Sequence, residues 1–473
     1  MDFFMQYLLL TLITLIASIF VLQKRRKAGG TKNLPPGSFG WPLVGETYQF
    51  LFNKIEHFLQ ERIKKHSSEI FHTSILGEPT VVLCGPGGSK FVSSNETKLV
   101  KVWYMKTQHR LFNIPDQTHA AMPKPTLEAT SVKILGILKP EGISRYMGNK
   151  FESIMQQHLN THWEGKTQVK VYPLVKAFTL TLVCHFFLGI DEPHHAAKFA
   201  SDFENLHLGI YSVPVNIPGS TYRRALKAAA AIRNKIQFLI NEKIDALSKG
   251  HVVDGLLAQV VCAEQGGKYV PRLEISNIIM GLMNSSHIPI AITLAFMIKL
   301  IGQRPDIYQK IVSEHGGVTK SKGYGTALDW DSIQKLKYTW AVAQETMRLY
   351  PTAPGGFREV ITDITYQGFT IPKGWKIFWA LIGKNKNPKY FDEPESFDPS
   401  RFEGNVPTPY TWIPFGAGPR SCPGVDYTRF VILNFIHFLI TKFKWEVILP
   451  DEKVCGALIP TPAEGIPIHL HHF

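Results

Sequence analysis

The stretch from Phe415 to Gly424 reads FGAGPRSCPG, and an apolar segment with helical spacing follows it from Phe430 to Phe443. A cysteine just before a helix, as Cys422 is here, places its sulfur near free amide donors and the positive end of the helix dipole, which lowers the pKa of the thiol. Pro423 suits the first turn of that helix. Three glycines permit tight turns and close approach to a flat cofactor: Gly416, Gly418 and Gly424. The stretch therefore predicts a thiolate at Cys422.

The same residues resemble the haem-binding signature of the cytochrome P450 superfamily, in which Phe, Gly, Arg, Cys and Gly recur at this spacing. The resemblance implies that Cys422 is the axial ligand of the iron in heme b, because a thiolate pushes electron density onto haem iron and favours O–O cleavage. It also implies that Phe415 shields the sulfur, that Arg420 pairs with a haem propionate, and that Gly418 and Gly424 contact the haem. The alternative is a structural cysteine in a glycine-rich turn. The match to the signature from Phe415 to Gly424 argues against this alternative.

Two upstream motifs extend the resemblance. Glu345 and Arg348, in ETMR, are an acid and a base three residues apart on one helix face. In the superfamily this pair meets an arginine, and Arg401 stands at the matching position, so the trio is expected to stabilise the scaffold on the haem side. Such a pair alone is weak support, since exposed helix pairs are common. Arg358 stands where related enzymes place a second arginine that binds a propionate, although a surface residue of a strand would look the same.

The predicted central helix departs from the superfamily pattern. Related enzymes carry an acid followed by Thr, which relay protons to dioxygen. This chain has Ile288 and Pro289 at those positions, and neither side chain relays a proton. Pro289 also removes a helical hydrogen bond. Ser286 and His287 lie within one turn and are our candidates for catalytic residues that relay protons through water; a packed polar residue is the alternative for each.

The segment before Lys139 departs as well, because no basic residue that grips a propionate is recognisable there. Ser131 and Lys133 are the polar residues that remain. Haem retention is therefore expected to depend on Arg358 and Arg420.

Hydrophobic periodicity predicts a mainly α fold with small β-sheets. Residues 69–83 alternate around Gly77-Glu78-Pro79, as in a β-hairpin, and β-like runs recur between Phe357 and Trp379. Residues 144–345 are mostly helical in spacing. Polar side chains within the long apolar segment Ile278–Leu300 favour a buried central helix over a membrane span. The resemblance implies the cytochrome P450 fold, a helical bundle around a buried haem.

The N-terminus predicts a membrane helix. Residues 5–22 are almost entirely apolar and residues 24–27 are all basic, which places the basic flank in the cytosol. A cleaved signal peptide is the alternative. The prolines in LPPG at residues 34–37 indicate a stiff hinge. We therefore expect an anchor with its basic flank at 1–27, a Pro-rich hinge at 28–40 and a catalytic domain at 41–473.

Composition excludes several classes of protein. The chain has 473 residues, 44% of them hydrophobic, which is enough for a large core. Five cysteines without regular spacing indicate a reducing compartment rather than a disulfide framework. The net charge of +14 is spread along the chain without a nucleic-acid motif, so an acidic protein partner or an anionic membrane is expected and nucleic acid is not.

Four further segments resemble plant triterpenoid oxidases, in particular beta-amyrin 28-oxidases and more distantly taxane hydroxylases: 34–46, 79–86, 139–141 and 450–473. This resemblance implies a monooxygenase that hydroxylates a polycyclic terpenoid of the beta-amyrin type with dioxygen. It also implies electrons from NADPH through cytochrome P450 reductase, and a single-pass enzyme of the endoplasmic reticulum membrane whose catalytic domain faces the cytosol. Because of Ile288 and Pro289, two alternatives stay open: a haem-thiolate isomerase or dehydratase, and a catalytically weak terpenoid-binding haem protein.

Overall fold

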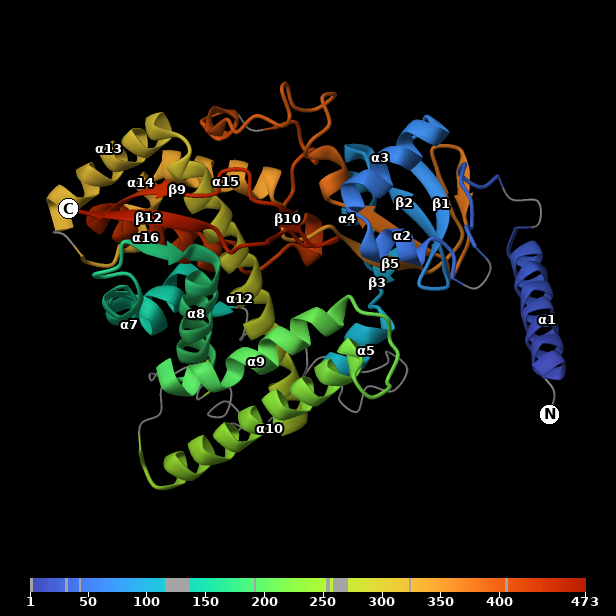
Figure 1. Cartoon of the computed structure of the whole chain (residues 1–473), viewed down its shortest axis with the longest axis horizontal. Coiled ribbons are helices and arrows are strands. Elements are labelled where there is room, and N and C mark those ends of the chain that lie inside the picture. The colour runs from blue at the N-terminus through green and yellow to red at the C-terminus, as the bar shows by residue number, and fades with distance from the viewer. Residues whose placement is uncertain are drawn as a thin grey trace.

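The computed structural model describes residues 3–29, 33–41, 44–114, 136–190, 193–251, 256–257, 271–322, 325–404 and 407–473. Within these ranges most residues are helical, and the strands gather in small sheets (Figure 1). The predicted mainly α fold with small β-sheets is confirmed.

The described helices are α1 (Phe3–Gly29), α2 (Thr47–Phe52), α3 (Ile55–His66), α4 (Pro86–Ser94), α5 (Lys106–Phe112), α7 (Pro140–His162), α8 (Val171–Val183), α9 (Pro193–Ile210), α10 (Thr221–Ser248), α12 (Arg272–Gly302), α13 (Pro305–Lys322), α14 (Trp330–Lys335), α15 (Lys337–Leu349) and α16 (Val425–Lys442). A π-helical turn follows α8 at Cys184–Leu188, and 3₁₀ turns lie at Ile382–Lys384, Pro399–Phe402 and Gly418–Arg420.

The described strands are β1 (Ile70–Ile75), β2 (Glu78–Leu83), β3 (Val100–Val102), β4 (Gln168–Lys170), β5 (Gly355–Val360), β6 (Ile364–Tyr366), β7 (Phe369–Ile371), β8 (Lys376–Ala380), β9 (Phe443–Val447), β10 (Val454–Cys455), β11 (Thr461–Pro462) and β12 (Pro467–His472). The largest sheet has the order β1-β2-β8-β5-β3.

This largest sheet brings together the two β-rich segments of the sequence. β1 and β2 form the predicted antiparallel hairpin, and β8 joins β2 in parallel. β5 then pairs with β8 in antiparallel register, which places Arg358 opposite Ile377. Every residue of β8 is buried, as expected for a central strand that is covered on both faces. The sheet therefore holds Arg358 on a rigid support.

The long apolar segment near the middle of the chain is a buried helix. α12 is apolar over most of its surface, which is typical of a helix inside a core. α12 and the segment Val171–Leu188 are long and apolar enough to cross a membrane, but 78% and 61% of their apolar stretches are buried by the rest of the protein. The prediction of a buried central helix at Ile278–Leu300 is confirmed.

The first helix has a different environment. Apolar side chains between Met5 and Ile19 are exposed, for example Tyr7 at 71% and Leu10 at 66%. Figure 1 shows α1 standing apart from the body of the protein. Exposed apolar surface of this extent is unfavourable in water.

A buried ion cluster joins α15 to the irregular chain that follows β8. Arg348 donates from Nε and Nη2 to the two carboxylate oxygens of Glu345 at 2.6 and 2.7 Å, and neither side chain is exposed. Arg348 Nη1 also donates to the carbonyl oxygens of Asn385 and Pro394 at 2.7 and 2.6 Å. Arg401 Nε lies 3.5 Å from Glu345 Oε1, so the predicted trio is confirmed.

We predict that Glu345→Gln strongly destabilises the fold. The substitution leaves the buried Arg348 charge uncompensated, which typically costs about 3–5 kcal/mol of unfolding free energy. Asp245→Asn is the matched control, because Asp245 pairs with Lys249 at 2.6 Å with both side chains exposed, and such pairs contribute about 1 kcal/mol or less. Urea denaturation followed by tryptophan fluorescence measures both changes. Equal midpoints for the two variants would show that the buried cluster is not critical.

Candidate active site

Cys422 lies at the end of a tight loop that leads into α16. Its backbone N–H donates to the carbonyl oxygen of Phe415 at 2.7 Å, which closes the loop. Gly418 has a φ of +75°, and a Cβ at this position would lie 2.6 Å from the carbonyl oxygen of Ser93 in α4. The loop therefore packs against α4 only because residue 418 is glycine. The backbone N–H of Gly424 donates to Cys422 Sγ at 3.4 Å.

The protonation of Cys422 differs from the sequence-based expectation. Burial raises the pKa of the Cys422 thiol, and the hydrogen bond from the Gly424 N–H only partly opposes this effect. The amide at the start of the helix lowers this pKa as predicted, but one N–H at 3.4 Å does not outweigh desolvation, so the net shift is upward.

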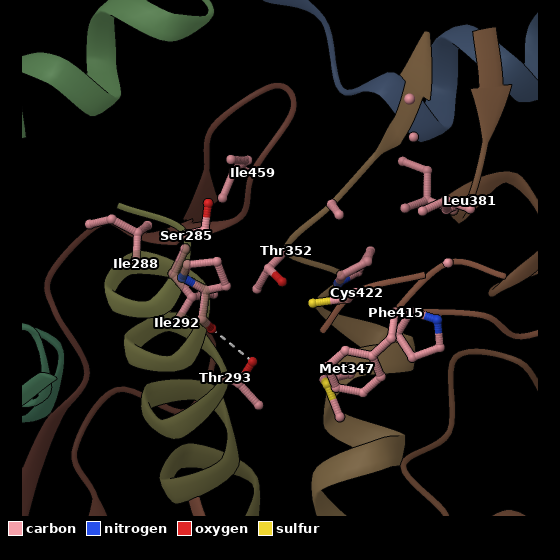
Figure 2. A pocket seen from close by; sticks show the side chains of 18 of the residues that line it. Ser285, Ile288, Ile292, Thr293, Met347, Thr352, Leu381, Phe415, Cys422 and Ile459 are labelled. Carbon is pink, nitrogen blue, oxygen red and sulfur yellow. Dashed lines mark hydrogen bonds between the residues drawn. The ribbon is translucent and has the colours of Figure 1, made fainter. Parts of the chain in front are cut away.

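Cys422 opens onto a cavity of about 420 Å³. Its walls come from α9, α12, the end of α15, the β5–β8 region and the loop that carries Phe415. Figure 2 shows Ser285 and Thr293 of α12 on one side of this pocket and Cys422 with Phe415 on the other. Most of the lining is apolar, including Ile210, Ile288, Ile292, Met347, Leu381 and Ile459. The pocket therefore suits an apolar compound held above the sulfur.

The structure does not bring Ser286 and His287 to this pocket. Neither residue lines it, whereas Ser285 and Pro289 do. His287 is buried against α8, where Thr179 Oγ1 lies 2.7 Å from its Nδ1. Burial lowers the pKa of His287 to about 3, so the ring stays neutral. On α12 the polar groups that face the pocket are instead Asn284, Ser285 and Thr293, which sequence reasoning missed.

The structure brings Arg358 and Arg420 to the pocket wall. Arg358 is buried and donates from Nε to Glu96 at 2.6 Å, a partner distant in sequence that no motif indicated. The other carboxylate oxygen of Glu96 is buried without a hydrogen-bond partner within the described residues. The side chain of Arg420 is exposed. Ser131 and Lys133 lie outside the described residues.

These groups fit a haem. One sulfur faces a mostly apolar pocket whose wall carries two guanidinium groups, which match the chemistry of one iron atom and two carboxylates. Within the described residues no three His, Cys, Asp or Glu side chains gather in a way that could hold a metal ion.

Comparison with known proteins agrees with the site. Residues 35–461 match the family model of cytochrome P450. The chain belongs to the cytochrome P450 family. It is 40% identical to a beta-amyrin 28-monooxygenase of Medicago truncatula, over 99% of this chain and 98% of that protein. It is 39% identical to a beta-amyrin 6-beta-monooxygenase of Solanum lycopersicum, over 99% of both chains.

A solved cyanobacterial cytochrome P450 with bound retinoic acid shares the fold. The TM-score is 0.81 at 24% identity, over 94% of this chain and all of that one. This P450 is accordingly an oxidoreductase of the monooxygenase type, and its cofactor is haem iron with a thiolate ligand.

We predict that Cys422→Ser abolishes the red-shifted Soret band of the reduced carbon monoxide complex, because thiolate donation to the iron causes that shift. Cys455→Ser is the matched control, since Cys455 is also a free cysteine but lies in β10 and does not line the pocket. Optical difference spectra of the purified variants measure the band. A normal band in the Cys422 variant would remove this residue as the ligand.

Proposed function

We propose that this P450 hydroxylates a polycyclic triterpene of the beta-amyrin type, using dioxygen and electrons that NADPH–cytochrome P450 reductase transfers from NADPH. The observation that carries this proposal is full-length similarity to several beta-amyrin monooxygenases, at 37–40% identity. The apolar side chains that α9 and α12 contribute to the pocket, such as Ile210, Ile288 and Ile292, agree with an apolar substrate.

His207 gives this pocket one polar contact for such a substrate. It lies on α9 and lines the pocket, and its Nδ1 is buried without a hydrogen-bond partner within the described residues. Burial lowers the pKa of His207, so the ring is neutral. A hydroxyl group of a triterpene satisfies an unpaired ring nitrogen of this kind. We assign His207 the role of orienting the substrate.

The haem would be held by the residues that the sequence analysis selected. Cys422 would ligate the iron, and Phe415, Gly418 and Gly424 would shape the loop around its sulfur. Arg358 and Arg420 would pair with the propionates, since guanidinium groups bind carboxylates through charge-assisted hydrogen bonds. When bound, haem iron supplies the activation of dioxygen.

We also propose that the N-terminal helix anchors the protein in a membrane. The exposed apolar side chains of α1 support an anchor at 1–27 in the endoplasmic reticulum membrane. Residues 28–40 would act as the hinge, of which 30–32 lie outside the described residues. The catalytic domain, 41–473, would face the cytosol, where the reductase delivers electrons.

An isomerase or dehydratase remains the second candidate, because Ile288 and Pro289 replace the acid–Thr pair. The names of the relatives favour monooxygenation. Microsomes that contain the enzyme and the reductase should convert beta-amyrin to an alcohol that carries label from ¹⁸O₂, and only when NADPH is present. Conversion without reductase would favour rearrangement. A substrate-induced spectral shift without any product would favour a binding protein.

We predict that deletion of residues 1–26 releases much of the protein from membranes while the haem spectrum is retained, since α1 stands apart from the body. Carbonate extraction followed by sedimentation measures the membrane-bound fraction. Exposed apolar side chains of the body, such as Val213, Val215 and Ile217, should leave some peripheral binding that carbonate reverses. If the truncated protein resisted carbonate as fully as the whole chain, a second membrane span would be required, and α12 would be its source.

A further inference from the structure

The pocket face of α12 carries a serine whose hydroxyl has no partner. Ser285 is exposed to the pocket, and no hydrogen bond of its hydroxyl occurs within the described residues. Thr293 also lines the pocket, but its hydroxyl donates to the carbonyl oxygen of Pro289 at 2.9 Å. Figure 2 shows both side chains and the hydrogen bond of Thr293. Of these two hydroxyls, only that of Ser285 has its proton free to donate to water or substrate.

Pro289 adds a second open group at the same place. In an α-helix the N–H of residue 289 would donate to the carbonyl oxygen of Ser285, and proline has no N–H. The carbonyl of Ser285 thus lacks its regular helical donor. A hydroxyl and a carbonyl of one residue together offer a donor and an acceptor, which suits an ordered water molecule.

A second cavity leads away from Ser285 along the same helix. It has a volume of about 530 Å³ and shares Asn284 and Ser285 with the pocket above Cys422. Further along α12 it is lined by Asn277 and Glu274. The four side chains lie along one side of the helix. The first and the last are eleven residues apart, which is about three full turns. Between them Gly281 leaves the wall open, because a Cβ there would meet only Phe112 at 3.9 Å.

Both ends of this polar row carry unpaired buried atoms. Asn284 Oδ1 and Glu274 Oε2 are buried without a hydrogen-bond partner within the described ranges. Asn277 is held in place by Arg233, whose Nε donates to its Oδ1 at 2.7 Å. Burial raises the pKa of the Glu274 carboxyl. Unpaired buried polar atoms beside a cavity are the usual partners of ordered water.

We propose that Ser285 delivers protons to the oxygen chemistry of this pocket, and that water in the second cavity resupplies them from Glu274 past Asn277 and Asn284. Monooxygenation consumes dioxygen, two electrons from the reductase and two protons; one oxygen atom enters the C–H bond of the substrate and the other leaves as water. The protons pass from water to the Ser285 hydroxyl and onward, so the serine is regenerated. This route replaces the missing acid–Thr pair at Ile288 and Pro289.

The test compares Ser285→Ala and Glu274→Gln with Ser201→Ala, a matched control at an exposed serine of α9. Alanine favours helix, so folding is preserved. The substrate-free optical spectrum of Ser285→Ala should shift toward the high-spin form, because water in the pocket loses a hydrogen-bond partner. Product per NADPH consumed should fall about 10²-fold and peroxide should rise. Glu274→Gln should lower product per NADPH to a smaller extent, and Ser201→Ala should match the wild type.

Pro289→Ala provides a second, independent variant. It restores an N–H donor to the Ser285 carbonyl, so it should shift the substrate-free spectrum in the same direction as Ser285→Ala. The proposal is overturned if Ser285→Ala changes neither the spectrum nor product per NADPH. It is also overturned if Ser286→Ala produces these effects and Ser285→Ala does not, which would return the relay to the sequence-based candidate.

The turnover measurements rest on the proposed triterpene oxidation, whereas the spectrum does not. If the wild-type enzyme oxidised no triterpene but Ser285→Ala still shifted the substrate-free spectrum, the proposed substrate would fail and the role of Ser285 would be supported. If triterpene oxidation were efficient in both wild type and Ser285→Ala, the proposed function would stand and the proton route would be wrong.

Discussion

The buried contact between Glu345 and Arg348 is the interaction on which the rest of the site depends. A fully buried arginine is unfavourable unless every donor is paired, and here the carboxylate and several backbone carbonyls satisfy it. Because those carbonyls belong to residues 385–396, the charge fixes irregular chain that hydrophobic packing alone would not order. Asp398 joins through its N–H, which donates to Glu345 at 3.0 Å. The long loop toward Cys422 therefore starts from a rigid position.

The central helix combines two roles that usually conflict. As a core element, α12 is apolar over most of its surface and is covered by α8, α10 and α15. As a pocket wall, it must present polar groups next to a cavity. Pro289 allows both roles, because it has no N–H to donate to the carbonyl of Ser285. That carbonyl stays free to accept a hydrogen bond, and no charged side chain is added to the core. A carboxylate at position 288 would be buried beside apolar side chains at a desolvation cost.

The charged groups near Cys422 also need partners of opposite charge, as the buried arginine Arg348 does. Burial raises the pKa of the Cys422 thiol, and a bound haem iron would supply a positive charge that favours the thiolate. Arg358 is buried as well, and Glu96 holds it in place through one carboxylate oxygen. Each charged group of the site thus pairs with an opposite charge. Either a residue of the protein supplies that charge, or a bound cofactor would supply it. This dependence explains why loss of a single partner is expected to disturb the whole pocket.

The sequence by itself determined the Cys422 loop, the Glu345–Arg348 pair and the buried central helix, because each depends on residues that are close in sequence or on a strong apolar pattern. Arg401, which is distant in sequence, was placed only by the family resemblance. Only the tertiary structure decided which side of α12 faces the pocket. Successive residues of a helix point about 100° apart, and packing against α8 turns His287 into the core and Ser285 toward the cavity. Likewise, Glu96 meets Arg358 across 262 positions of chain through the pairing of β3 with β5, which no local motif records.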